Sequence, residues 1–188
     1  MKSENLTAQE SLDIITSMIR EAKGNVKRNN FFYLLWGWVV MLANLGMFTL
    51  IQLGYQRPYV VWVITIPAWI ITLVVGIRQG RRNNSPTHFD RISGSLWFCF
   101  GVVVFTVVGF GFKLNYQINP LILTLSAIPT FVSGVILKFR PLIIGGSLFW
   151  LFGIAAFLVE REYQPLVGAV AIVCGYLIPG YMLKRVQS

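Results

Sequence analysis

The side chains that could do chemistry are few and lie far apart in the sequence. The single histidine, His88, lies two residues before Asp90, and one imidazole beside one carboxylate makes neither a metal site nor a catalytic triad. Glu160 and Glu162 are also two residues apart, and we expect both to be solvated. No phosphate-binding Gly-rich loop, Cys-x-x-Cys pair or nucleophile elbow occurs in the sequence. We therefore predict that the protein is not an enzyme and has no catalytic residue, metal site or cofactor.

Asn44 is the only amide that lies well inside a long apolar segment. These segments contain no Asp, Glu, Lys, Arg or His away from their ends, which disfavours transport driven by protons or ions. An amide in an apolar segment needs a hydrogen-bond partner, and a neighbouring helix commonly supplies one. We expect Asn44 to bond another helix, with contact to a ligand as the alternative.

The composition places the chain in a membrane. Hydrophobic residues make up 55% of its 188 residues, and its mean hydropathy is +0.65. A helix needs about 20 apolar residues to cross a bilayer. Six such segments are expected within a transmembrane domain at 31–184, which is followed by a cytoplasmic tail at 185–188. The six lie at about 31–53, 59–77, 93–112, 118–137, 142–159 and 165–183. The predicted fold class is an all-α polytopic membrane protein.

The basic residues predict the orientation of the chain in the membrane. The net charge is +9, and of the 16 Lys and Arg residues only Arg57, Lys113 and Arg161 fall on one side of the six alternating segments. An excess of Lys and Arg marks the cytoplasmic side. We predict a multi-pass membrane protein with both termini in the cytoplasm. The basic residues then set the orientation of the chain in the lipid bilayer, and no nucleic-acid partner is expected.

Residues 1–30 are expected to form a cytoplasmic amphipathic helix and a linker. Thr7 and Glu10 fit a capping box that begins a helix, and we expect Gly24-Asn25 to end or bend it. Apolar residues three and four positions apart form one stripe, and these candidate partner-binding residues are Leu12, Ile15, Ile19, Ala22 and Val26. The stripe could lie on the cytoplasmic leaflet or bind a protein partner.

The six segments pair into three similar units. Residues 94–101 and 146–153 share Gly-Ser-Leu, two central aromatics and a final Gly at an offset of 52 residues. An Ile-Pro pair follows 33 to 35 residues after the start of each unit, at Pro67, Pro129 and Pro179. This periodicity predicts three tandem parallel hairpins. A proline frees the carbonyl four residues earlier, so the expected kinks lie near Val63, Leu125 and Gly175.

Small residues in these segments predict close contacts between helices. Residues without large side chains let the backbones of membrane helices approach one another. The candidates are Gly94 with Gly101, Gly146 with Gly153, and the ladder Ser126, Thr130 and Gly134. We interpret all of them, like the three prolines, as packing positions.

Several short motifs carry a resemblance to a known group of proteins. They are Leu34-Leu35-Trp36-Gly37, Trp62 with Ile66-Pro67, and Tyr176-Leu177-Ile178-Pro179-Gly180-Tyr181-Met182-Leu183. With its N-terminal amphipathic helix, the chain resembles, over nearly its whole length, an uncharacterised six-pass inner-membrane protein family of Gram-negative bacteria. A looser similarity is to short-repeat acid-resistance membrane proteins, which are also built from tandem hairpins. Neither resemblance implies an established activity or a catalytic residue.

Two functions remain open at this stage. The first is a non-catalytic membrane protein that acts through a cytoplasmic or membrane partner, in a regulatory or scaffolding role. Its basis is that residues 1–30 and 78–91 are the sizeable polar surfaces. The alternative is a carrier or flippase for an uncharged or lipidic substrate, with a path near Asn44 and the kinks at Pro67 and Pro129. Assembly into a homo-oligomer is compatible with either function.

Overall fold

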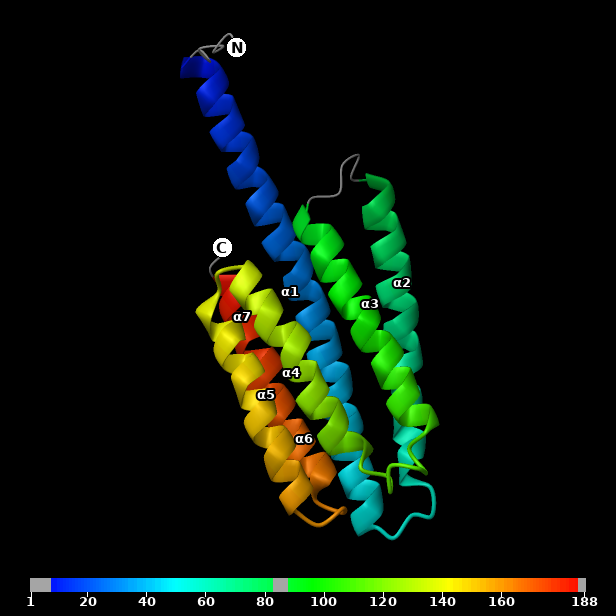
Figure 1. The fold of residues 1–188 in the computed structure, drawn as a ribbon. Coiled ribbons are helices and arrows are strands. Elements are labelled where there is room, and N and C mark those ends of the chain that lie inside the picture. Colours follow the sequence, from blue (N-terminus) through cyan, green and yellow to red (C-terminus); the bar gives the residue numbers. More distant parts are fainter. Residues whose placement is uncertain (1–7, 83–87, 186–188) are drawn as a thin grey trace.

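The computed structural model describes the backbone of residues 8–82 and 88–185 and the side chains of residues 30–78 and 91–183. Within these residues there is no strand, and Figure 1 shows the helices side by side in one bundle. In chain order they are α1 (Ala8–Gln52), the 3-10 helix η1 (Pro58–Ile64), α2 (Thr65–Arg82), α3 (His88–Gly109), α4 (Ile118–Ile136), α5 (Arg140–Leu158), α6 (Gln164–Ile172), the π-helix η2 (Val173–Leu177) and α7 (Ile178–Arg185).

Six helical stretches of the described chain are long and apolar enough to cross a membrane. They are Asn30–Gln52, Pro58–Arg78, Arg91–Gly109, Ile118–Ile136, Arg140–Leu158 and Gln164–Leu183. The second combines η1 with α2, and the sixth combines α6, η2 and α7. These bounds differ from the predicted segments by a few residues at most. The prediction of an all-helical, multi-pass membrane protein is therefore confirmed.

The first helix differs from the prediction at its N-terminal part. We expected Gly24-Asn25 to end or bend a separate helix, but α1 continues through both residues into the first span. A single Gly costs a helix only about 1 kcal/mol, and extending an already formed helix avoids the cost of starting a new one. Figure 1 shows α1 reaching past the ends of the other helices. The side chains of the predicted apolar stripe lie outside the described residues.

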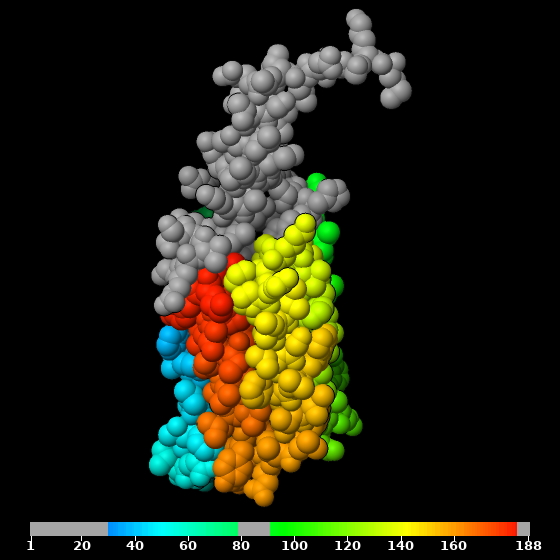
Figure 2. Space-filling model, turned by 90° about the vertical axis from the view of Figure 1, so that its left-hand side faces the viewer, coloured from blue at the N-terminus to red at the C-terminus, as the bar shows by residue number. Residues whose placement is uncertain are grey.

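The core of the bundle lies at α4, α5 and the α6–α7 span, with α1 packed against that span. In an apolar stretch of 18 residues within each span, 44% and 56% of residues are buried in the fourth and sixth spans, against 6% in the second and third. Figure 2 shows the α6–α7 span between α1 and α5, and Figure 1 shows α2 and α3 on the other side of α1. The four central spans therefore form the packed unit, and α2 and α3 are peripheral.

Aromatic contacts attach the peripheral helices to the core. The Trp36 and Trp69 rings lie 5.1 Å apart, and the Trp36 indole donates a hydrogen bond of 3.0 Å to the Thr72 hydroxyl. Trp69 also lies 5.5 Å from the Phe105 ring of α3. Trp69 of α2 thus links α1 with α3.

Glycines allow α4 and α5 to come into close contact. A Cβ atom added to Gly134 would lie 2.7 Å from the amide nitrogen of Ile143. One added to Gly146 would lie 2.7 Å from the backbone of Phe131. The predicted ladder of small residues on α4 is buried: Ser126, Thr130 and Gly134. The predicted packing role of these α4 and α5 residues is therefore confirmed.

The equivalent glycines of α3 do not make such contacts. A Cβ atom on Gly94 would meet no atom of the described structure within 4 Å, and one on Gly101 would lie 3.6 Å from Trp69. Gly94 lies in the peripheral helix α3, where no backbone of the described residues packs against it. The prediction that Gly94 mediates close helix packing was therefore wrong, although its sequence motif matches that of Gly146.

The three prolines affect their helices differently. The π-helix η2 includes Gly175, so the helix departs from α geometry where the Pro179 kink was predicted. Val63 lies in the 3-10 helix η1, and Pro67 lies in the first turn of α2, so the helix changes type close to the kink that was predicted there. Around Pro129, α4 stays α-helical, so no change of helix type accompanies the kink predicted near Leu125.

The two matched glycines give opposite expectations for stability. We expect Gly146→Ala to destabilise the protein by about 1–3 kcal/mol, because the new methyl group would overlap the α4 backbone. Gly94→Ala should stabilise it by about 0.5–1 kcal/mol, because alanine favours a helix and the site is open. Unfolding monitored by circular dichroism in detergent measures both. Equal effects of the two substitutions would contradict the close contact between α4 and α5.

Candidate functional site

Asn44 is buried where α1 meets α4 and α6. Its side chain is 1% exposed, and eight residues separate it from the end of α1 at Gln52, about 12 Å along the helix. The amide nitrogen of Asn44 donates to the Val40 carbonyl at 2.9 Å. Its amide oxygen accepts a hydrogen bond of 3.2 Å from the Asn119 side chain on α4. The structure therefore places Asn44 in a hydrogen bond between helices, as the first interpretation of the sequence expected.

Gly168 of α6 provides the space for these two amides. A Cβ atom on Gly168 would lie 2.8 Å from the amide oxygen of Asn44 and 3.0 Å from that of Asn119. A larger residue would push the two amides away from α6. Three helices, α1, α4 and α6, therefore meet at this hydrogen bond.

Two further polar contacts continue from this pair toward the ends of the helices. Gln164, which is 3% exposed, donates a hydrogen bond of 2.7 Å to the side-chain oxygen of Gln117. Arg161 then donates one of 2.7 Å to the Asn115 carbonyl. Asn115 has a positive φ of 49°, so the chain turns sharply just before α4. We call the three contacts, Asn44–Asn119, Gln117–Gln164 and Asn115–Arg161, the polar ladder.

The polar ladder was only partly predictable from the sequence. Asn44 was identified because it lies deep in an apolar segment. Asn119 and Gln117 lie at the start of α4, and Gln164 at the start of α6, where polar residues at the membrane surface are expected in any case. Gln117 and Gln164 lie 47 residues apart, and nothing in the sequence indicates that they pair.

The predicted proline positions lie apart from this ladder. Pro129 is ten residues beyond Asn119, about 15 Å along α4. Pro129 and Pro179 are buried in the bundle, whereas Pro67 is exposed on the surface of α2. The structure therefore does not bring the prolines together with Asn44 as a common path through the bundle would require.

A second cluster surrounds Tyr176 in the other half of the bundle. The Phe149 ring lies 4.8 Å from Tyr176, and the Tyr33 ring lies 5.6 Å from it. The Tyr176 hydroxyl is 3.2 Å from that of Thr130 on α4. A Cβ atom on the preceding Gly175 would lie 2.6 Å from the Phe149 ring. The π-helix η2 is thus enclosed by aromatic side chains, which is a packing role.

Comparison with known proteins assigns no function to this chain, so the role of the polar ladder is interpreted from its geometry. No protein-family model, curated protein or solved structure matches this chain. Among the residues that the structure describes, no group of three His, Cys, Asp or Glu side chains could hold a metal ion. The resemblance to a six-pass inner-membrane family stays a prediction.

The polar ladder is suited to stabilising the contact between helices. The Asn44 nitrogen is bonded to its own helix and its oxygen to Asn119, so the amide is occupied by protein partners. Interhelical hydrogen bonds of this kind contribute about 0.6 kcal/mol each on average. The geometry therefore favours a structural role for Asn44 over contact with a ligand.

A double-mutant cycle tests this role. We expect Asn44→Ala and Asn119→Ala each to lower the free energy of unfolding by about 1 kcal/mol. The double variant should lose less than the sum, with a coupling energy of about 0.6 kcal/mol. Gln52→Ala is the control, because Gln52 is an exposed amide at the end of the same helix. If the two effects add fully, Asn44 and Asn119 do not support one another.

Proposed function

We propose that this protein is a non-catalytic protein of the bacterial inner membrane that binds a cytoplasmic protein through the N-terminal part of α1. The observation that carries this proposal is the length of α1. The helix has 45 residues, and its membrane span takes 23 of them, Asn30–Gln52. The 22 residues from Ala8 to residue 29 therefore precede the span. As a helix they extend about 33 Å.

The continuity of α1 supports a protein partner over the membrane surface. A helix lying on the leaflet would have to turn before entering its span, and α1 has no break there. Its sequence places an apolar residue at every third or fourth position from Leu12 to Val26. An apolar stripe that leaves the bilayer needs a partner to cover it.

Charge supports cytoplasmic termini. Arg78, Arg91 and Arg140 are exposed near the ends of α2, α3 and α5 that lie on the same side of the bundle as both termini. The opposite side carries Arg57, Lys113 and Arg161. Because an excess of basic residues marks the cytoplasmic side, this arrangement supports a cytoplasmic location for the N-terminal part of α1.

The packing also supports a tandem repeat of α3–α4 and α5–α7. Trp97 and Phe149 occupy equivalent positions 52 residues apart, and both face Tyr176, at 6.4 Å and 4.8 Å. The next residues face outward, with Phe98 73% and Trp150 36% exposed. We infer that the two hairpins are copies of one unit, which places their helices in the same direction through the membrane.

A carrier or flippase for an uncharged or lipidic substrate is the weaker alternative. It requires an amide free to meet a substrate, together with helices that bend near that amide. Asn44 is bonded to Asn119, and Pro129 lies about 15 Å further along α4. These observations support the interaction role.

Paired charge substitutions test the partner. Ile15→Glu with Ile19→Glu places two carboxylates on the apolar stripe and should release a cytoplasmic protein that copurifies with the wild type in mild detergent. Ser17→Glu is the matched control, because position 17 falls on the opposite side of the helix. Mass spectrometry of the copurified proteins gives the result. Recovery of the same partner with the double substitution would contradict the proposal.

Reporter fusions test the orientation. A fluorescent protein that folds only in the cytoplasm should be bright when fused after Ser188 and dark when inserted beside Lys113. A periplasmic phosphatase should show the reverse pattern. The opposite result would place the N-terminal part of α1 outside the cytoplasm and would exclude a cytoplasmic partner.

A further inference from the structure

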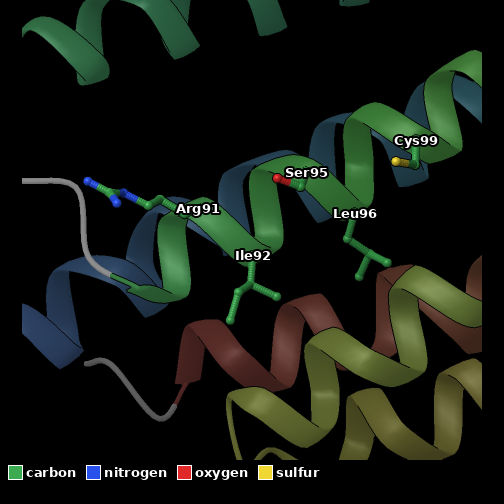
Figure 3. A pocket seen from close by; sticks show the side chains of 5 residues that line it. All are labelled: Arg91, Ile92, Ser95, Leu96 and Cys99. Atoms are coloured by element: carbon green, nitrogen blue, oxygen red, sulfur yellow. The ribbon is translucent and has the colours of Figure 1, made fainter.

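The surface of α3 carries an open groove of about 450 Å³. The lining residues are Arg91, Ile92, Ser95, Leu96 and Cys99. Figure 3 shows Arg91 extending from one end of this part of α3, with Ile92 and Leu96 extending from its lower side. The groove therefore joins a mostly apolar wall with a guanidinium group at one end.

The position of the groove matches one leaflet of a bilayer. From Arg91 to Cys99 the helix rises about 12 Å, and half of the hydrocarbon core of a bilayer is about 15 Å thick. Arg91 begins the third span, at the side of the bundle that carries both termini. Arg91, Ile92, Ser95 and Cys99 are exposed on the surface of the bundle, so the groove opens outward. A molecule in it would have its polar end at the membrane surface and its apolar end within the leaflet.

We propose that this groove binds an anionic phospholipid. The guanidinium of Arg91 and the hydroxyl of Ser95 donate hydrogen bonds to the phosphate oxygens. One acyl chain lies along Ile92, Leu96 and Cys99. Charge complementarity selects an anionic headgroup over a zwitterionic one, because the guanidinium carries a full positive charge at the membrane surface. This inference is independent of a partner on α1.

The test measures lipids that stay with the purified full-length protein. The protein is equilibrated with equal amounts of phosphatidylglycerol and phosphatidylethanolamine in detergent, and native mass spectrometry counts the lipids retained. We expect the wild type to retain phosphatidylglycerol in preference. Arg91→Gln should lower this preference about fivefold. Leu96→Trp, which fills the groove without changing charge, should also lower the amount retained.

Arg78→Gln provides the matched control. Arg78 is exposed at the same end of the bundle on α2, so its substitution removes the same charge outside the groove. It should retain phosphatidylglycerol as the wild type does, and circular dichroism checks that each variant keeps its helix content. Equal losses for Arg91→Gln and Arg78→Gln would indicate general surface attraction and overturn the proposal. Unchanged retention in Leu96→Trp, or no preference in the wild type, would overturn it as well.

Discussion

The close contact between α4 and α5 is the interaction on which the rest of the structure depends. Lipid chains are as apolar as leucine, so burying apolar surface between helices gains little inside a bilayer. Association then depends on dense packing, which Gly134 and Gly146 allow by leaving no side chain between the two backbones. This pair of helices provides the surface on which the last span packs, and α1 closes the unit on the other side.

The last span is held by different contacts at its start and in its middle. At the start of α6, Gln164 donates a hydrogen bond to Gln117 just before α4, and Gly168 packs beside the Asn44–Asn119 bond that joins α1 to α4. In the middle of the span, the wider π-helical turn η2 places Tyr176 among aromatic rings and brings Gly175 against Gly145 of α5. Buried hydrogen bonds thus hold the start of the span, and shape complementarity holds the part around η2.

The sequence predicts this fold where a feature depends on composition or local spacing. The number and positions of the spans follow from hydropathy, and the burial of Thr130 and Gly134 follows from their small size and spacing. The sequence does not predict a feature that depends on which helix packs beside a given residue. Gly94 and Gly146 share one motif, yet only Gly146 meets another backbone. Asn44 could be recognised alone, whereas its partner Asn119 lies among residues that a membrane surface would solvate in any case.

The unbroken path of α1 also has a mechanical consequence. A helix that continues without a sharp kink from within the bilayer into solvent transmits a change in the tilt of its span to its outer part. The part of α1 before the span is about 33 Å long, so a change of about 10° in the tilt of the span would move its N-terminal end by about 6 Å. Tilt depends on bilayer thickness as well as on the packing of neighbouring helices. A change in membrane thickness that tilts α1 within the bundle would therefore move its N-terminal part laterally.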